Sequence, residues 1–367
     1  MENFIVSARK YRPDTFQTVV GQAQISSTLK NAIASGKIAH AYLFCGSRGV
    51  GKTTTARIFA KTINCENLSA EVEPCNACES CKAFNENRSY NIHELDAASN
   101  RGVEEMQKLI DQVRIPPQVG KYSVFIIDEV HMLTAHAFNA FLKTLEEPPA
   151  HAKFILATTE KHKILPTILS RCQIYDFNRM TIDDTVKHLQ SVAEKEGVEV
   201  EAAALNVIAQ KADGAMRDAL SIFDQIVSFC GKQVTYQQAI QNLNVLDYDY
   251  YFRAVDALLK HDVSTVLLLF NDVLQHGFDG HHFVIGLSTH LRDLLVCRDQ
   301  ATVQLLQVGQ EVKEKYKEQA QQCEQAFLLE ALQICSDCDV HYKSNDNKRL
   351  AVEISLMRMA QLGLKKK

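Results

Sequence analysis

The sequence predicts an α/β domain built on a parallel sheet, followed by an all-helical region. Residues 41–63 read as a short apolar strand, a glycine-rich loop and a helix. Further apolar runs of strand length lie at residues 91–95, 123–127, 153–158 and 173–177, with helical patterns between most of them. This alternation favours parallel strands joined by helices. After Met180 only helical spacing continues.

The glycine-rich loop predicts a phosphate-binding site. Its glycines let the backbone turn N–H groups toward phosphate oxygens, and the helix that follows adds free N–H donors and a positive dipole end. Lys52 would reach the β- and γ-phosphates, and the Thr53 hydroxyl would bind Mg²⁺. A chance glycine loop is the alternative, but every fixed position of the motif is present in strand–loop–helix order. The residues expected to bind nucleotide here are Gly46, Ser47, Arg48, Gly49, Val50, Gly51, Lys52, Thr53 and Thr54.

The composition is that of a folded protein with nearly balanced charge. The 367 residues are 46% hydrophobic and 23% charged, with a formal net charge of −4. A strongly basic nucleic-acid binder is excluded, so any contact with DNA is expected from local patches or helix ends. No apolar stretch reaches the length of a membrane span, and the N-terminus lacks a secretory pattern. We expect a cytoplasmic protein with no membrane partner, in which the cysteines are thiols or metal ligands.

The first 40 residues contain an extended start at Pro13 and a helical pattern from Ile25 to Ile33. Lying directly before the glycine-rich loop, they could cover the adenine and ribose of a nucleotide. An ordinary N-terminal arm fits the same spacing equally well.

Four cysteines follow the helix of the glycine-rich loop, at Cys65, Cys75, Cys78 and Cys81. Four thiolates at this spacing suit a tetrahedral Zn²⁺, and a closed set of four leaves no open position for catalysis. We therefore expect a structural zinc knuckle at about residues 65–81, with reduced free thiols as the alternative. The Cys-x-x-Cys pair at residues 335–338 lies in a helical pattern with no second pair nearby, and ordinary helix cysteines explain it better.

Polar residues follow two of the apolar strands. Asp128 would hold Mg²⁺, directly or through water, and Glu129 would orient or deprotonate an attacking water. A surface carboxylate pair is the alternative. Thr158 and Thr159 end the next strand, where a hydroxyl could sense the γ-phosphate, although threonine is common at strand ends.

Helical spacing also runs from Val103 to Val113, and Ser99 or Asn100 is expected to cap that helix. Arg101 beside its start could meet DNA phosphate, or be a solvated surface arginine. Residues 134–145 predict another helix, with Phe138, Phe141, Leu142 and Leu145 facing inward and two prolines ending it.

Beyond Met180, helices are predicted at residues 181–193, 201–211, 216–230, 236–243, 250–259, 263–274, 284–297 and 350–362. Arg217 stands at the start of one of them. Gly277 and Gly280 are expected to mark a break.

These motifs occur in the order of a known family. The glycine-rich loop, the cysteine insertion, Asp128-Glu129, Thr158-Thr159, Ser170-Arg171-Cys172 and residues 214–218 (Gly-Ala-Met-Arg-Asp) resemble those of the AAA+ clamp-loader ATPases, the gamma/tau subunits of bacterial DNA polymerase III. The resemblance covers nearly the whole chain and is strongest from about Ala8 to Leu220. After Leu246 it rests only on helical character and position.

The resemblance implies a role for each matching residue. Lys52 and Thr53 would bind ATP and Mg²⁺, Asp128 and Glu129 would form the Walker B pair, and Thr158 or Thr159 would be the first sensor. Arg171 would be an arginine finger acting on the ATP of a neighbouring subunit, and Arg217 a second sensor. The four cysteines would bind Zn²⁺. The adenine pocket would be lined by Tyr11, Arg12, Val19 and Val20.

The resemblance also implies an architecture and a function. An AAA+ P-loop domain at residues 1–179 would carry the zinc knuckle, a helical lid would span 180–243 and a helical collar 244–367. The chain would hydrolyse ATP within the DNA polymerase III holoenzyme to open the sliding clamp and load it onto primed DNA. Its partners would be the delta and delta prime subunits, further gamma/tau copies, the clamp and primer–template DNA. The alternatives are another AAA+ DNA motor, such as a branch-migration helicase, and a non-catalytic scaffold.

Overall fold

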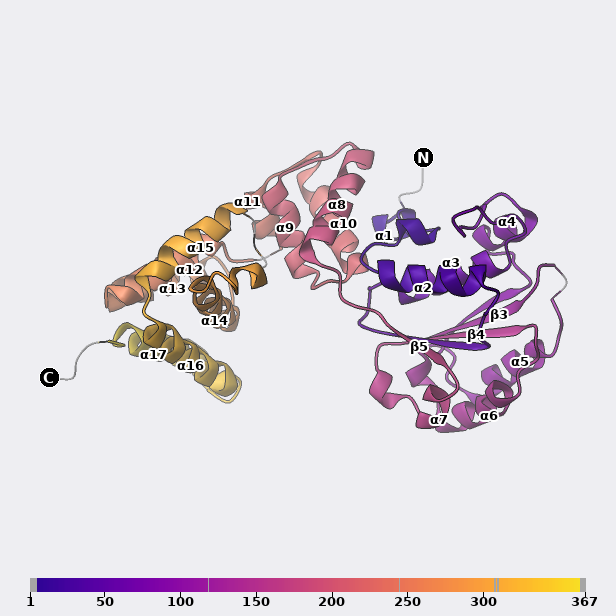
Figure 1. The fold of residues 1–367 in the computed structure, drawn as a ribbon. Coiled ribbons are helices and arrows are strands. Elements are labelled where there is room, and N and C mark those ends of the chain that lie inside the picture. The colour runs from indigo at the N-terminus through magenta and orange to yellow at the C-terminus, as the bar shows by residue number, and fades with distance from the viewer. Residues whose placement is uncertain (1–4, 118, 244, 307, 309, 364–367) are drawn as a thin grey trace. The chain divides into compact units, whose positions relative to one another are not determined.

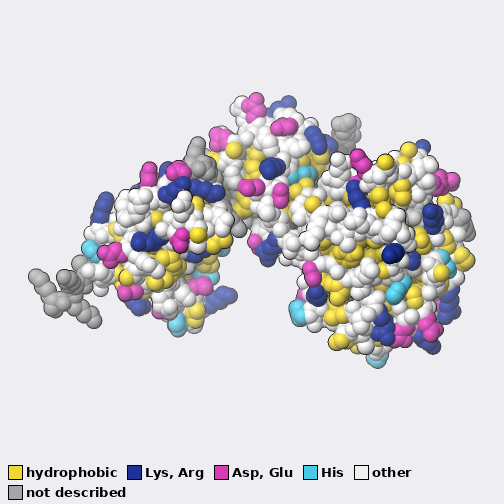
Figure 2. Space-filling view, in the orientation of Figure 1, with side chains coloured by type: hydrophobic (Ala, Val, Ile, Leu, Met, Phe, Trp, Pro, Cys, Tyr) yellow, Lys and Arg dark blue, Asp and Glu magenta, His cyan; other side chains and the backbone are white. Residues whose placement is uncertain are grey.

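The computed structural model describes residues 5–117, 119–243, 245–306, 308 and 310–363 (Figure 1). The chain divides into two compact units. The first comprises Met1–Gly197 and Ile208–Gln225, and the second Val198–Val207 and Ile226–Lys367. No helix in the described part of the chain is long and apolar enough to cross a membrane. On the face shown in Figure 2, lysine and arginine side chains are interspersed with aspartate and glutamate.

The first unit is built on a five-stranded parallel sheet in the order β2-β3-β4-β1-β5. The strands are β1 (Ala41–Cys45), β2 (Ile92–Asp96), β3 (Ser123–Asp128), β4 (Ala152–Thr158) and β5 (Gln173–Asp176). β1 pairs with both β4 and β5, so the loop that leaves β1 lies inside the row of strands. All five predicted strands are therefore confirmed.

Helices cover both faces of this sheet, which explains the continuous apolar runs of its central strands. α2 (Ala23–Ala34) and α3 (Lys52–Ile63) lie on one face, and α5 (Val103–Val113), α6 (Ala135–Glu146) and α7 (Pro166–Leu169) on the other (Figure 1). Alternate residues of each strand enter two separate cores: Tyr42 and Phe44 pack on the α3 side, whereas Leu43 packs with Phe125 on the α5 side. The predicted α6 core residues Phe138, Phe141 and Leu145 are buried, and Leu142 is half-buried.

The remaining elements of the first unit lie around this core. They are α1 (Ser7–Lys10), η1 (Phe16–Thr18), α4 (Glu79–Asn85), η2 (Val130–Met132), η3 (Lys161–Lys163) and α8 (Ile182–Glu196). α9 (Ala202–Lys211) and α10 (Met216–Cys230) each contribute residues to both units.

The second unit is mainly helical. Its elements are β6 (Glu199–Val200), β7 (Gln233–Val234), α11 (Tyr236–Asn242), α12 (Tyr248–Leu259), α13 (Val263–Gln275), α14 (Gly280–Cys297), η4 (Val303–Leu305), α15 (Gln310–Gln322), α16 (Gln325–Tyr342) and α17 (Lys348–Ala360). α12 to α17 share one apolar core. Within it, His290 is 1% exposed, and its ring nitrogens contact the Tyr316 hydroxyl and the Gln319 amide oxygen at 2.9 Å each.

Three expectations about local structure are wrong. Neither Ser99 nor Asn100 caps α5: the N-cap is Gly102, because both side chains bond to Asp96 instead. The predicted break between helices is confirmed at Gly277, which lies between α13 and α14, but Gly280 is the first residue of α14. Asp279 caps that helix by accepting hydrogen bonds from the backbone N–H groups of His281 and His282. The region after Met180 also contains two parallel strands, β6 and β7. Each has two residues, which is too short to show the alternation of apolar and polar residues that predicts a strand.

Candidate functional site

The glycine-rich loop connects β1 to α3, as predicted, and its backbone requires glycine. Gly46 has φ +149°, and a Cβ there would lie 2.6 Å from the Phe177 carbonyl oxygen. Gly49 has φ +77°, and its Cβ would lie 2.9 Å from that of Ala215. At these two positions the loop is therefore packed tightly against other segments, with room for backbone atoms alone.

Lys52 begins α3 and folds back over the loop. Its ammonium donates to the carbonyl oxygens of Gly46 at 2.7 Å and Ser47 at 2.8 Å, and the residue is 5% exposed. Burial lowers the pKa of Lys52, and the nearby carboxylates of Glu129 and Asp128 oppose that shift. The loop thus holds a largely desolvated cation beside its own backbone.

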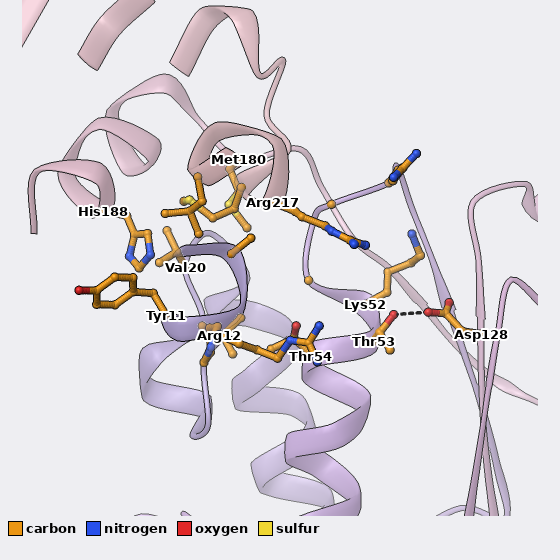
Figure 3. A pocket seen from close by; sticks show the side chains of 18 of the residues that line it. Tyr11, Arg12, Val20, Lys52, Thr53, Thr54, Asp128, Met180, His188 and Arg217 are labelled. Carbon is orange, nitrogen blue, oxygen red and sulfur yellow. Dashed lines mark hydrogen bonds between the residues drawn. The ribbon is translucent and has the colours of Figure 1, made fainter. Parts of the chain in front are cut away.

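Thr53 and Asp128 meet across the ends of α3 and β3. The Thr53 hydroxyl donates to Asp128 Oδ2 at 2.6 Å, as Figure 3 shows. Both oxygens are hard ligands of the kind that Mg²⁺ prefers. This pair fits a magnesium site in its donor chemistry.

Glu129 has a left-handed backbone (φ +47°), which turns its side chain toward the end of β4. Its Oε2 accepts from the Thr159 hydroxyl at 3.0 Å and the Thr159 backbone N–H at 3.3 Å, and lies 3.4 Å from His131 Nδ1. Thr158 is fully buried, and its hydroxyl lies 3.0 Å from His131 Nδ1. Of the two threonines, Thr159 therefore contacts the acidic pair directly, while Thr158 reaches it through His131.

A cavity of about 440 Å³ opens beside these residues. One end is lined by Lys52, Thr53, Asp128 and Arg217, and the other by Tyr11, Val20, Met180 and His188 (Figure 3). Its remaining lining is Ala8, Arg12, Pro13, Val19, Arg48, Gly49, Gly51, Thr54, Asp96, Ala98, Glu129, Met216 and Leu220. The cavity thus joins a charged end to an apolar and aromatic end.

The apolar end is walled by the N-terminal arm and by the helices after the sheet. Tyr11 donates from its hydroxyl to Glu196 Oε1 of α8 at 2.5 Å, and Lys10 contacts the same oxygen at 2.6 Å. His188 of α8 lies close to the Tyr11 side chain in Figure 3. Burial, with a further contribution from Lys195, lowers the pKa of His188, so its ring is neutral at pH 7.

The four predicted cysteines come together in the insertion after α3. The sulfur atoms of Cys65, Cys75, Cys78 and Cys81 lie within 4.8 Å of one another. Backbone N–H groups point at these sulfurs, from Cys75 to Cys65 at 3.3 Å and from Cys78 to Cys75 at 3.2 Å. The N–H of Ala77 lowers the pKa of Cys75 to about 6, while burial raises that of Cys81. Four converging sulfurs with N–H support fit a tetrahedral thiolate site for Zn²⁺.

Arg171 lies away from this cavity. Its guanidinium donates to Glu146 Oε1 at 2.7 Å and to the carbonyl oxygen of Thr167 at 2.6 Å, near the end of α7. It is absent from the cavity lining. The loop residues Gly46, Ser47 and Val50 are also outside the lining, as are Thr158 at the end of β4 and Thr159 after it.

Comparisons with known proteins agree along most of the chain. Residues 21–181 match the family described as DNA polymerase III, delta subunit. Residues 184–232 match the DNA polymerase III clamp loader subunit ATPase lid domain, and residues 234–366 match domain III of the DNA polymerase III gamma and tau subunits. A DNA polymerase III subunit gamma of Buchnera aphidicola (subsp. Acyrthosiphon pisum) is 34% identical over 97% of this chain and 99% of its own length.

The chain belongs to the gamma/tau family of DNA polymerase III subunits. Its fold is accordingly an AAA+ P-loop domain with a parallel sheet, followed by a lid and a helical C-terminal domain. Bacillus subtilis DNA polymerase III subunit tau is 40% identical over 96% of this chain. The chain spans 62% of the length of that relative.

The Thermotoga maritima RuvB branch migration motor aligns with a TM-score of 0.49 at 18% identity, covering 73% of this chain and 86% of that one. A similarity of that size says nothing about activity.

Within this gamma/tau family member, several cavity residues were not found from the sequence. His188, Met180, Met216 and Leu220 all follow the last strand of the sheet. Met180 lies just before α8, His188 lies on α8, and Met216 and Leu220 lie on α10. Helical spacing alone does not separate a core position from a cavity wall. Arg217 is the exception, because a cation at a helix start stood out in the sequence. Arg101 is placed by a hydrogen bond from its Nε to the Ala98 carbonyl oxygen at 2.8 Å.

Proposed function

We propose that this chain is the ATP-hydrolysing subunit of a bacterial clamp loader, which uses ATP to open a sliding clamp and load it onto primed DNA. The observation that carries the proposal is the cavity with a Lys52–Thr53 charged end and an apolar end, in a chain of the gamma/tau family. Its partners would be the delta and delta prime subunits, further gamma/tau copies, the clamp and primer–template DNA.

The two ends of the cavity match the two ends of ATP. The adenine would lie between Tyr11 of the N-terminal arm and His188 of α8, with Arg12, Val19 and Val20 beside it. The phosphates would lie along the glycine-rich loop, where Lys52 would exchange its two carbonyl contacts for phosphate oxygens. Arg217 at the start of α10 would reach the same phosphates as the second sensor.

The acidic pair would supply the hydrolytic chemistry. Thr53 and Asp128 would hold Mg²⁺, which neutralises charge on the phosphates when bound. Glu129 would orient or deprotonate the attacking water. We assign the first sensor to Thr159, because its hydroxyl already donates to Glu129, and Thr158 would act through His131.

Arg171 would complete the cavity of a neighbouring subunit. Its absence from the lining of its own cavity supports action in trans, and its present partner, Glu146, is a half-exposed surface carboxylate. An exposed ion pair of this kind is worth about 0–1 kcal/mol. Arg171 can therefore leave Glu146 at little cost when a neighbour's ATP becomes available.

The cysteine insertion would hold Zn²⁺ through Cys65, Cys75, Cys78 and Cys81. With four protein ligands the ion would have no open position, so its role would be structural. No hydrolytic step would involve it.

The first test is ATP turnover by the chain together with its companion subunits, clamp and primed DNA, compared with the chain alone. We expect strong stimulation only when clamp and primed DNA are both present. A rate that neither partner changes would contradict clamp loading. Processive translocation on DNA in its place would favour a branch-migration motor, and no turnover in the full assembly would favour a scaffold.

The second test replaces the arginine finger. Arg171→Ala should leave ATP affinity unchanged and lower stimulated turnover at least tenfold, since such an arginine supplies on the order of 10³–10⁵ in rate. Arg88→Ala is the matched control, because Arg88 is an exposed arginine paired with Glu86 in the same unit. Equal turnover by the two variants would refute the in-trans role.

A further inference from the structure

One carboxylate of the cysteine insertion binds the N-terminal arm. Glu73 is 8% exposed, and its two oxygens accept from the backbone N–H groups of Phe16 at 2.8 Å and Gln17 at 3.0 Å. The same carboxylate lies 2.5 Å from the ammonium of Lys30 on α2. All three of these donors come from outside the insertion, so Glu73 ties the insertion to the rest of the unit.

The insertion holds Glu73 in place through a tight turn that ends at the cysteine cluster. Ser69 and Glu73 bond to each other twice, through Ser69 N–H to the Glu73 carbonyl at 3.1 Å and Glu73 N–H to Ser69 Oγ at 3.0 Å. Two residues later Cys75 donates its N–H to Cys65 Sγ. The position of the Glu73 carboxylate therefore depends on the closed arrangement of the sulfurs.

The segment that Glu73 binds lies between two stretches of the cavity wall. Phe16 and Gln17 begin η1, and the residues on both sides of it line the cavity: Tyr11, Arg12 and Pro13 before, Val19 and Val20 after. Phe16 itself is 2% exposed and fixes the arm in the core beside α2 and β1. A shift of η1 would therefore move the wall on both sides at once.

A second contact runs parallel to the first. Asn76, between two of the cysteines, donates to Asp14 Oδ2 at 3.3 Å and accepts from the buried Lys61 ammonium at 2.5 Å. Lys61 belongs to α3, whose first turn carries Lys52 and Thr53. The insertion thus contacts both the arm and the helix of the glycine-rich loop.

We propose that Glu73 is a positioning residue for the nucleotide, and that through it metal occupancy at the four cysteines and nucleotide binding in the cavity are coupled. The inference rests on the proposed function, in that it places an adenine nucleotide in the cavity and Zn²⁺ on the sulfurs. Without the metal the turn at residues 69–73 loses its anchor, and the two N–H groups and Lys30 lose a buried acceptor. The apparent affinity for nucleotide then falls in proportion to the fraction of molecules in which the N-terminal arm keeps its position in the cavity wall.

Coupling of this kind is reciprocal, which gives two independent measurements. The affinity for a fluorescent N-methylanthraniloyl ADP is measured with zinc loaded and after chelation, with circular dichroism to check that the helices remain. The rate of zinc transfer to a chromogenic chelator is measured with and without ADP. In the wild-type chain we expect chelation to weaken ADP about tenfold, the size of one lost charged hydrogen bond, and ADP to slow zinc release.

The variant Glu73→Gln identifies the residue, and Glu71→Gln is its matched control because Glu71 is exposed in the same insertion. Glu73→Gln should bind ADP about tenfold more weakly even with zinc loaded, and chelation should then change its affinity less than twofold. Its KM for ATP should rise while kcat at saturating ATP stays within twofold of wild type. Glu71→Gln should match wild type in every measurement.

Each alternative result has a distinct meaning. A wild-type chain that binds both zinc and ADP without mutual effect overturns the coupling and leaves the proposed function standing. Full coupling in Glu73→Gln overturns the assignment to Glu73. A chain that retains no zinc, or binds no ADP, overturns both the coupling and the corresponding part of the proposed function. The wild-type measurements decide the coupling even where the Glu73 variant fails to fold.

Discussion

Replacing Lys52 by methionine should separate ligand binding from stability. The substitution keeps an unbranched side chain and removes the charge. In the free protein the ammonium is buried, and burial lowers its pKa, so the folded state carries a cost for keeping it charged. We therefore expect Lys52→Met to leave the free protein as stable as wild type or more stable, while ATP and ADP bind much more weakly.

The size of the loss follows from the contacts that Lys52 would make. A hydrogen bond to a charged group is worth about 1.5–3 kcal/mol, which weakens binding about 10- to 150-fold. With nucleotide at 100 times the wild-type Kd, wild type gains about 2.7 kcal/mol, and a variant weakened 100-fold gains about 0.4 kcal/mol. At about 2–4 °C per kcal/mol for a unit of this size, the nucleotide-induced rise in Tm falls from about 5–10 °C to about 1–2 °C.

The same variant has a defined pH dependence. The pKa of Lys52 is below its ordinary 10.5 in the folded state and near 10.5 in the unfolded chain. Between those two values the unfolded chain binds more protons, so the free energy of unfolding rises with pH. The cost of the buried charge is therefore complete below the folded pKa and disappears as pH approaches 10.5. Any stability advantage of Lys52→Met over wild type should shrink over that range.

Thermal unfolding with and without ADP, repeated between pH 7 and 10.5, tests all three statements. Lys37→Met is the matched control, because Lys37 is an exposed lysine of the same unit. A Lys52→Met chain that keeps the wild-type shift in Tm, or that loses several kcal/mol without ligand, would refute the reasoning.

Two further substitutions test the loop and the helical unit. Gly46→Ala should destabilise the first unit by at least about 2 kcal/mol more than Gly36→Ala. Both positions have positive φ, but only Gly46 would place a Cβ against Phe177. Equal losses of stability for the two variants in denaturant unfolding would show that the loop can move aside. Burial lowers the pKa of His290 to about 4, so the folded chain stays neutral while the unfolded chain takes up a proton as pH falls below 6.5. The second unit should therefore lose about 3 kcal/mol between pH 6.5 and 4, and His290→Gln should remove most of that dependence; an unchanged pH profile in urea unfolding would contradict it.

The sheet could be predicted from the sequence because it is covered on both faces. Strands such as β3 and β4 then read as uninterrupted apolar runs, and their ends lie near the predicted residues. The local errors have a common cause. Ser99 and Asn100 are good capping residues, but Asp96 lies close enough to take their hydrogen bonds. The sequence shows which side chains can form hydrogen bonds, but the partner of each one depends on which groups the fold brings within reach.

The candidate site could be predicted only in part for a similar reason. Asp128 and Thr53 are signalled by strand and helix ends, which parallel topology brings to one edge of the sheet. His188 and Leu220 carry no such signal, because helices after the sheet supply them from ordinary amphipathic positions. Glu73 is one of many acidic residues in a polar loop, and only its burial against Phe16 and Gln17 distinguishes it.

The cavity is lined by residues far apart in the sequence, and this has a consequence for synthesis of the chain. Its lining begins at Ala8 and ends at Leu220, so the glycine-rich loop leaves the ribosome long before the helices that close the cavity. At about 5–20 residues per second, the interval between Lys52 and Leu220 is roughly ten to thirty seconds. During that time the nascent chain has the glycine-rich loop but lacks the cavity wall that α8 and α10 supply. A nucleotide that needs the complete cavity would therefore bind only after Leu220 has been made, and would act on the finished first unit.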